Sequence, residues 1–373
     1  MTLQKPRTTL RTEKEEKVFI TDCEGPISKN DNAYEITEHF IPDGATFYAT
    51  ISRYDDVQAD LVKRPGYKAG DTLRLILPFL MAYGVTNSKI EKFSSEHILL
   101  VPGAKSTLGF IQSIMSSFIV STSYEHYMRA LCSLVDFPYG NVYCTKLDVD
   151  KYKLDEKEIT KLKQLRKEIV GMPMIHIPEN ASSINGLSMR DREATRRLDE
   201  IFWEEIATME CDRILKEVNP MGGFEKADAV QDIERKTGGN LFNTVYYGDS
   251  ITDVQPFRLV RENDGLTISF NGNRYAVREA EIAVLSDNTL MTSVLTDVFN
   301  RLGKESVIKL VEEWSYSALD AYCAPALRNH MFDLYPETLP KVEVIAPSNK
   351  ERLMEESTVF RRTVRGESIG ALG

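Results

Sequence analysis

Two short apolar runs, more than two hundred residues apart, each end in carboxylates beside a glycine. The first run is followed by Asp22 and Glu24, and the second is followed by Asp249 and Asp253. Both runs are rich in β-branched and aromatic residues, which favour strands. In an open α/β sheet the carboxyl ends of neighbouring parallel strands meet in one crevice. We therefore expect these four carboxylates to lie close together.

Carboxylates gathered in one crevice repel one another and need a positive counter-charge. Mg2+ prefers hard oxygen ligands and is the natural counter-ion. A carboxylate held beside such an ion is also able to attack phosphorus as a nucleophile. The sequence therefore predicts metal-dependent phosphoryl chemistry.

The bulk composition limits the partners that this chain can have. Its 373 residues carry a formal net charge of −10, which argues against nucleic acid or an anionic membrane as the main partner. A small phosphorylated substrate is compatible with this charge, because a metal and a few local cations override it. The five cysteines form no disulfide, zinc or iron–sulfur spacing. With no run of 18 apolar residues, we expect a cytoplasmic protein without membrane insertion.

Strand and helix patterns alternate along the chain but are interrupted twice by helical stretches. This pattern predicts an α/β fold, a doubly wound parallel-sheet core with a helical cap and a second helical insertion. The expected parts are a mobile tail at 1–16, a catalytic core from 17–28, 100–147 and 225–290, a cap at 29–99, an insertion at 148–224, and a C-terminal helical extension and tail at 291–373. After residue 331 three prolines predict irregular structure, and we expect a docking surface rather than chemistry in the extension.

Four motifs, taken in chain order, resemble the haloacid-dehalogenase-like superfamily of phosphohydrolases, nearest to its phosphoserine-phosphatase-like branch. They are Asp22-Cys-Glu24, Ser121 at the end of an apolar run, Lys226, and Gly248-Asp249 with Asp253. The resemblance implies that Asp22 is the nucleophile and forms an aspartyl-phosphate. It implies that Glu24 is the general acid and base, at a position where most members carry aspartate.

The same resemblance implies the binding residues. Ser121 and Thr122 hold phosphate oxygens, and Lys226 neutralises the transferring group. Thr122 and Ser123 are also expected to open a helix whose positive end faces the anion. Mg2+ is ligated by Asp22, the backbone carbonyl of Glu24 and Asp249. Asp253 either ligates the ion or orients Lys226 and metal-bound water.

The resemblance does not carry the substrate. In the cap, Asp31 or Glu35 is a candidate acid for binding the substrate. Phosphoserine-specific members also use an arginine of a cap helix, but the matching helix, 72–77, is apolar where that arginine is expected, although Arg74 lies close by. The layout also resembles an archaeal group described as energy-converting hydrogenase A subunit R. That similarity implies a regulatory soluble subunit or partner that engages protein through its C-terminal extension. A phosphotransferase using the same site is a third alternative.

Overall fold

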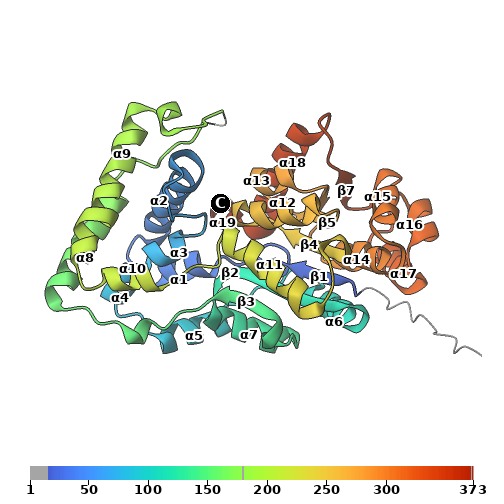
Figure 1. Ribbon diagram of the computed structural model, residues 1–373, viewed down its shortest axis with the longest axis horizontal. Helices are drawn as coiled ribbons and strands as arrows, with labels where there is room; N and C mark the ends of the chain where they lie inside the picture. Colours follow the sequence, from blue (N-terminus) through green and yellow to red (C-terminus); the bar gives the residue numbers. More distant parts are fainter. Residues whose placement is uncertain (1–15, 179, 371, 373) are drawn as a thin grey trace, which may run out of the picture.

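The computed structural model describes residues 16–178, 180–370 and 372, and its centre is a seven-stranded sheet (Figure 1). The expected tail at 1–16 lies outside the described residues, apart from residue 16. The strand order is β3-β2-β1-β4-β5-β6-β7. The strands are β1 (Val18–Thr21), β2 (Ser116–Tyr124), β3 (Val142–Thr145), β4 (Thr244–Gly248), β5 (Leu266–Phe270), β6 (Ile282–Leu285) and β7 (Lys341–Val344). Only β7 runs antiparallel to its neighbour.

Helices cover both faces of this sheet, so the expected doubly wound α/β core is confirmed. One face carries α11 (Gly223–Thr237), α12 (Val254–Glu262) and α13 (Arg274–Glu279). The other carries α6 (Ala104–Ile114), α7 (Glu125–Val135) and α14 (Leu290–Leu302). Because both faces are covered, all residues of β1, β4, β5 and β6 are buried, which explains their continuous apolar runs.

The chain reverses its direction of progress across the sheet between β1 and β4. From β1 it builds outward through β2 to β3, and then it returns to pair β4 on the opposite side of β1. The loops after β1 and β4 therefore diverge and leave a crevice at the carboxyl ends of these two strands. The two carboxylate-bearing signatures follow these two strands.

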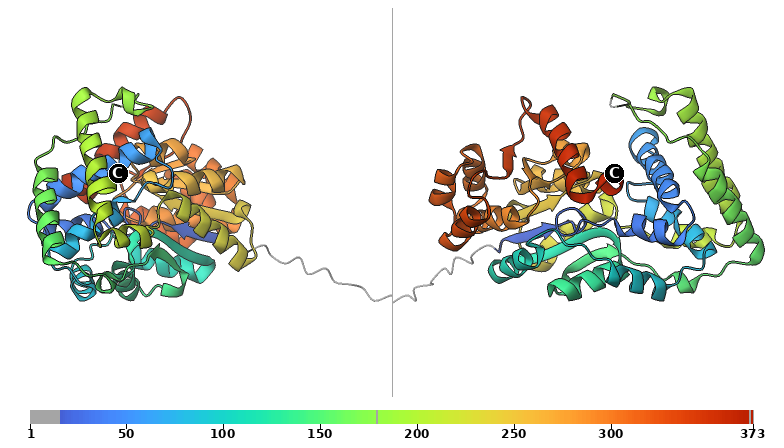
Figure 2. Two further views of the ribbon diagram at one scale, coloured as in Figure 1. Left: turned by 60° about the vertical axis from the view of Figure 1, so that its left-hand side comes forward. Right: turned by 180° about the vertical axis from the view of Figure 1, so that it is seen from behind.

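The cap and the insertion lie together on one side of the sheet (Figure 2). The cap contains α1 (Asn32–Phe40), α2 (Gly44–Asp56), α3 (Thr72–Leu75), α4 (Leu77–Ala82) and α5 (Asn87–Glu96), and the insertion contains α8 (Glu156–Val170), α9 (Met189–Glu200) and α10 (Asp212–Glu217). Their side chains share one apolar cluster, in which the rings of Tyr54 and Phe202 stack 5.7 Å apart. The insertion therefore packs against the cap and stabilises it.

The C-terminal extension is more regular than its prolines predict. After α15 (Lys304–Glu312), α16 (Tyr316–Tyr322) and α17 (Pro325–Leu334) it adds strand β7, helix α18 (Lys350–Arg365) and short helix α19 (Glu367–Gly370). The expectation of irregular structure after residue 331 is therefore wrong, because Pro336, Pro340 and Pro347 lie in the connections between these elements. Helix α18 packs on α13 and β6 and runs back toward the crevice.

None of the helices in the described ranges combines the length and apolarity needed to cross a bilayer.

Candidate functional site

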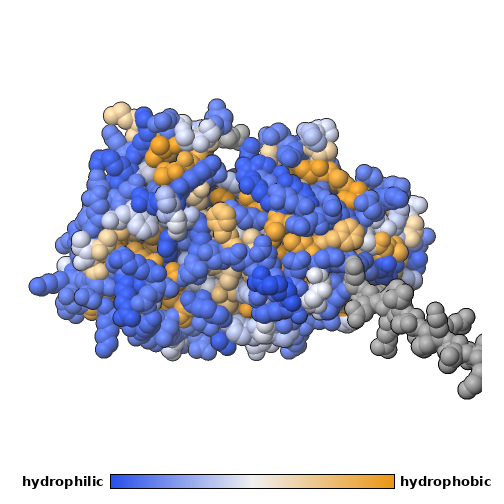
Figure 3. Space-filling view, in the orientation of Figure 1, coloured by the Kyte–Doolittle hydropathy of each residue, from blue (hydrophilic) through white to orange (hydrophobic). Residues whose placement is uncertain are grey.

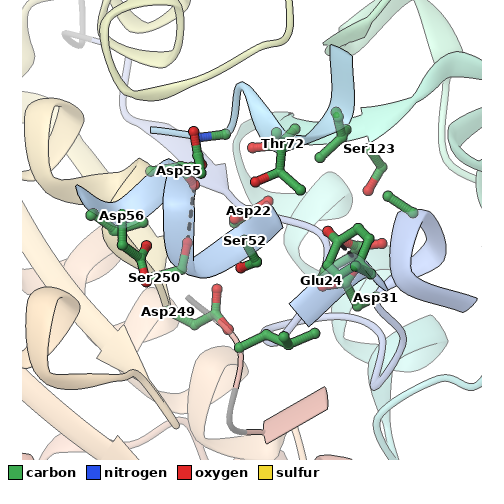
Figure 4. Close-up of a pocket in the computed structure, with 18 of the residues that line it drawn as sticks. Asp22, Glu24, Asp31, Ser52, Asp55, Asp56, Thr72, Ser123, Asp249 and Ser250 are labelled. Carbon is green, nitrogen blue, oxygen red and sulfur yellow. Dashed lines mark hydrogen bonds between the residues drawn. The ribbon is translucent and has the colours of Figure 1, made fainter. Parts of the chain in front are cut away.

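Three buried aspartates meet at the carboxyl ends of β1 and β4. Asp22 directly follows β1, and its backbone N–H donates to the carbonyl of Tyr247 in β4, at 2.8 Å. Asp249 directly follows β4, and Asp253 lies in the turn after it. Carboxylate oxygens of the three residues lie within 4.8 Å of one another. Figure 4 shows Asp22, Glu24 and Asp249 facing one cavity, whereas Asp253, the fourth carboxylate expected there, does not line it.

Lys226 bridges two of these aspartates from helix α11. Its Nζ donates to Oδ2 of Asp22 at 2.6 Å and to Oδ1 of Asp253 at 2.8 Å. The lysine is fully buried, with 0% of its surface exposed. Burial alone lowers the pKa of an ammonium group, but Asp22 and Asp253 more than offset this and raise the pKa of Lys226. A fixed positive charge therefore lies beside Asp22.

Both oxygens of Asp253 already have partners in the protein. Oδ1 accepts from Lys226 and from the hydroxyl of Tyr246, at 2.8 Å each. Oδ2 accepts from the backbone N–H groups of Asp249 and Ser250, at 2.9 and 3.0 Å. Of the two roles expected for Asp253, this arrangement favours orienting Lys226 and the turn that carries Asp249.

The two acids of the first signature have strongly perturbed pKa values. Burial raises the pKa of Asp22 to about 7 despite the lowering effect of Lys226. Burial, followed by the charge of Asp31, raises the pKa of Glu24 well above its ordinary value. Oε1 of Glu24 accepts from the N–H of Asn32 at 2.8 Å, which fixes its position at the cavity wall. A carboxyl group that keeps its proton near neutral pH is suited to general acid catalysis.

The serine motif differs from its expected local structure. Strand β2 continues through Ser121 to Tyr124, and helix α7 begins only at Glu125, so the expectation that Thr122 and Ser123 open a helix is wrong. Ser121 is buried, and its hydroxyl donates to that of Ser123 at 3.0 Å. Thr122 and Ser123 line the cavity, whereas Ser121 does not. The N-terminus of α7 therefore lies one or two residues beyond the motif.

Two arginines of helix α18 enter the site, contrary to the expectation that the C-terminal extension carries no chemistry. Arg361 donates to the carboxylate of Asp249, and Arg365 donates to the same oxygen at 3.1 Å. Arg365 also donates through Nε to the carbonyl of Lys29, at 3.1 Å. Both guanidinium groups are almost completely buried. The extension therefore supplies two positive charges to the centre of the site.

The sequence contains a weak signal for these arginines. The buried positions of α18 include Leu353, Ser357, Arg361 and Arg365, each four residues from the next. This spacing defines one helix face, and arginine at two of its buried positions is unusual because a buried charge needs a partner. The pattern indicates buried ion pairs but does not identify their partners.

The cap contributes acids to the outer wall of the cavity. Asp31 lines the cavity together with Asp55 and Asp56 of α2 (Figure 4). The other two candidates for gripping a substrate lie elsewhere: Glu35 is bound to the side-chain amide of Asn30, and Arg74 is paired with Asp71. Asp31 therefore remains the better candidate of the two acids named from the sequence.

The donor atoms of the site suit a hard divalent cation. Asp22 and Asp249 present carboxylate oxygens to one cavity, the type of ligand that Mg2+ prefers. Oδ2 of Asp249 is paired with the arginines, while its Oδ1 accepts no hydrogen bond from the described residues. This oxygen and those of Asp22 fit a metal ion.

No family model and no curated protein matches this chain. Among solved structures, the chain is similar to a gene product of Archaeoglobus fulgidus, with 27% identity and a TM-score of 0.78 over 96% of this chain and 99% of that one. It is also similar, at 13% identity and a TM-score of 0.44, to a substrate-bound phosphoserine phosphatase, with 74% of this chain and 96% of that one covered. A HAD family hydrolase from Salmonella enterica serovar Typhi has 11% identity and a TM-score of 0.42, with coverages of 71% and 67%.

Proposed function

We propose that the protein is a Mg2+-dependent phosphatase that hydrolyses a phosphoric monoester through an aspartyl-phosphate intermediate. The single observation that carries the proposal is the position of Asp22. This buried carboxylate lies at the switch point of the sheet, with Lys226 2.6 Å away and Glu24 on the same cavity wall. Two of the similar structures are named as a phosphoserine phosphatase and a HAD family hydrolase, which is consistent with this chemistry, but the proposal rests on the site itself.

The reaction has two steps in this proposal. An oxygen of Asp22 attacks phosphorus, the bond to the alcohol breaks, and Glu24 donates its proton to the departing oxygen. Water then attacks the aspartyl-phosphate while Glu24 accepts a proton from it, and the bond between phosphorus and Asp22 breaks to release phosphate. Lys226 balances the negative charge that develops on the phosphoryl oxygens, and Thr122 and Ser123 contact these oxygens.

Asp22, Asp249 and the backbone carbonyl of Glu24 would hold the metal. When bound, Mg2+ supplies positive charge that favours the ionised form of Asp22 and stabilises the charge on the phosphoryl group. Asp253 acts as a positioning residue for Lys226. Ser121 acts through Ser123, since its hydroxyl donates to that residue.

Phosphate release from an aryl phosphate and a panel of phosphorylated metabolites, with and without Mg2+, tests the proposal. We expect metal-dependent turnover that Asp22→Asn abolishes. Asp228→Asn is the matched control, because Asp228 is exposed on helix α11. Rapid quenching followed by mass spectrometry should find one phosphoryl group on the peptide that contains Asp22. Equal activity in wild type and Asp22→Asn would overturn the proposal.

The two alternatives from the sequence give different results in the same assay. A phosphotransferase would release little phosphate under any condition; adding an acceptor alcohol would speed release of the aryl alcohol and yield the phosphorylated acceptor instead. A regulatory subunit of an energy-converting hydrogenase would show no turnover at all, with or without Mg2+. No observation in the described structure favours that role.

A further inference from the structure

The catalytic cavity is small and opens to its surroundings. Its volume is about 100 Å³, enough for a phosphoryl group and a few water molecules. A larger substrate would extend from it into neighbouring space. Two hollows adjoin the cavity, one sharing Leu372 with it and the other sharing Ile251. Figure 3 shows the molecule hollowed between the lobe that holds α9 and the lobe that holds α18.

Most of the charged residues that line the first hollow are arginines. It has a volume of about 410 Å³ and lies between cap helix α2, the insertion, α13 and α18. Its charged lining residues are Arg53, Arg274, Arg278 and Arg362, with Asp60 and Glu351 as the acids. Positive side chains thus outnumber negative ones at this wall.

The second hollow has the same character. It has a volume of about 480 Å³ and lies between residues 59–69, which follow α2, and helices α12 and α13. Its charged lining residues are Lys63, Arg64, Lys68, Arg258 and Arg278, with Asp60 as the acid. The two hollows share Asp60, Tyr275 and Arg278 on their walls and therefore lie side by side; we call the two together the basic cleft.

Ion pairs behind the wall neutralise only part of this charge. Arg258 and Arg278 lie 2.7 and 3.2 Å from Glu279, and Arg261 lies 3.6 Å from the same carboxylate. Three guanidinium groups thus share one carboxylate. Four more of the basic residues each have an acidic partner: Arg53 with Asp56, Arg64 with Asp199, Lys68 with Glu225, and Arg274 with Glu351. A positive excess remains here, in a chain whose overall net charge is −10.

We propose that the basic cleft binds a second anionic group of the substrate. The substrate is then a phosphoester that carries at least one further phosphate or carboxylate, remote from the phosphoryl group that reacts. This inference rests on the proposed function, since it assigns a substrate class to the same site. Its physical basis is that a concave wall of one charge sign concentrates ligands of the opposite sign. Arginine is also well suited to bind planar carboxylates and phosphates through two hydrogen bonds.

Lys63 and Arg362 are the residues to change first. Both are exposed, and neither makes an ion pair with the described residues, so their removal should leave the fold intact. The test compares wild type with the double variant Lys63→Gln/Arg362→Gln. Lys153→Gln/Lys309→Gln is the matched control, because it removes the same charge from exposed positions that do not line the cleft.

Steady-state kinetics are measured with p-nitrophenyl phosphate, fructose 1,6-bisphosphate and 3-phosphoglycerate. We expect wild type to prefer one of the two compounds with a second anion, and the compound preferred separates a phosphate from a carboxylate. The double variant should lower this preference about fivefold to tenfold, through KM rather than kcat. Raising NaCl from about 50 mM to about 500 mM should lower it similarly, because exposed charges are screened by salt.

Two results separate this inference from the proposed function. If wild type hydrolyses all three compounds without preference, or if the double variant and the control behave alike, the basic cleft does not bind the second anion and phosphatase chemistry stands. If no compound is hydrolysed, the proposed function fails. Calorimetric binding of fructose 1,6-bisphosphate and p-nitrophenyl phosphate to Asp22→Asn then decides the inference. Equal affinity for the two compounds would overturn it.

Discussion

The guanidinium of Arg365 lies 3.1 Å from the carboxylate of Asp249, although 116 residues separate them in the chain. Arg361, one helical turn earlier, contacts the same oxygen. Asp249 follows a central strand of the sheet, whereas both arginines belong to the last long helix. The C-terminal extension therefore completes the charge balance of the crevice and forms part of the site.

The first prediction concerns this contact. Arg361 and a divalent cation both act on the carboxylate of Asp249, and two cations at close range repel each other. Removing the arginine in Arg361→Gln should therefore tighten Mg2+ binding, by about tenfold, as measured by calorimetry without substrate. Arg362→Gln is the control, because its side chain is exposed on the same helix. Unchanged or weaker Mg2+ binding in Arg361→Gln would show that the arginine does not oppose the ion.

The second prediction concerns the buried lysine. Lys226→Met leaves Asp22 and Asp253 without their shared cation, and such a loss typically costs about 3–5 kcal/mol of unfolding free energy. Chemical denaturation should detect this loss. Lys236→Met on the same helix removes an exposed lysine and should change stability little. Adding Asp253→Asn to Lys226→Met should restore part of the loss, since one uncompensated charge is then removed. If Lys226→Met is as stable as wild type, the contacts of Lys226 with Asp22 and Asp253 contribute little to folding.

The third prediction concerns Gly25, whose backbone φ is +99°. A Cβ at this position would overlap the carboxylate of Asp249. Gly25→Ala should therefore cost more than the roughly 1–2 kcal/mol of left-handed backbone strain, and it should also weaken Mg2+ binding by displacing Asp249. Gly66→Ala measures the backbone strain alone, because Gly66 has a φ of +73° and no atom lies within 4 Å of the position that a Cβ would take. Equal losses of stability in the two variants would argue against close packing of Asp249 on Gly25.

The fourth prediction concerns the pH dependence of stability at Asp55. Burial, followed by repulsion from Asp71, raises the pKa of Asp55 from 3.8 to about 8 in the folded protein. The folded protein therefore binds this proton more tightly than the unfolded chain does. The resulting stability is complete below about pH 4 and is lost as the pH rises to about 8.

Asp55→Asn removes this titration and should retain the hydrogen bond that the side chain accepts from the N–H of Gly70, which is 2.9 Å long. We expect the variant to melt at a higher temperature than wild type at pH 8, by at least about 2 °C, with the difference vanishing near pH 4. Asp228→Asn should show no such trend, since Asp228 is exposed. A melting difference that does not depend on pH would contradict the raised pKa of Asp55.

Local sequence pattern is sufficient to predict several parts of this protein. Continuous apolar runs with carboxylates at their ends predict parallel strands, and both signatures do follow neighbouring strands, β1 and β4. Lys226, whose Nζ contacts Asp22, was instead a candidate through the family resemblance. The strands could be predicted because burial on both faces of a sheet requires apolar residues at every position. The carboxylates could be placed together because parallel strands end at the same edge of the sheet.

Which distant segments share the crevice follows from packing and not from local pattern. The spacing of Arg361 and Arg365 indicates buried ion pairs, but their partner Asp249 is identified only once α18 packs on α13 and β6. The basic cleft arises in the same way, since Lys63 belongs to the cap and Arg362 to the last long helix. Local pattern does not predict these contacts, because they form between segments that are far apart in the sequence and meet only in the folded protein. The charges then interact through space, whatever their separation along the chain.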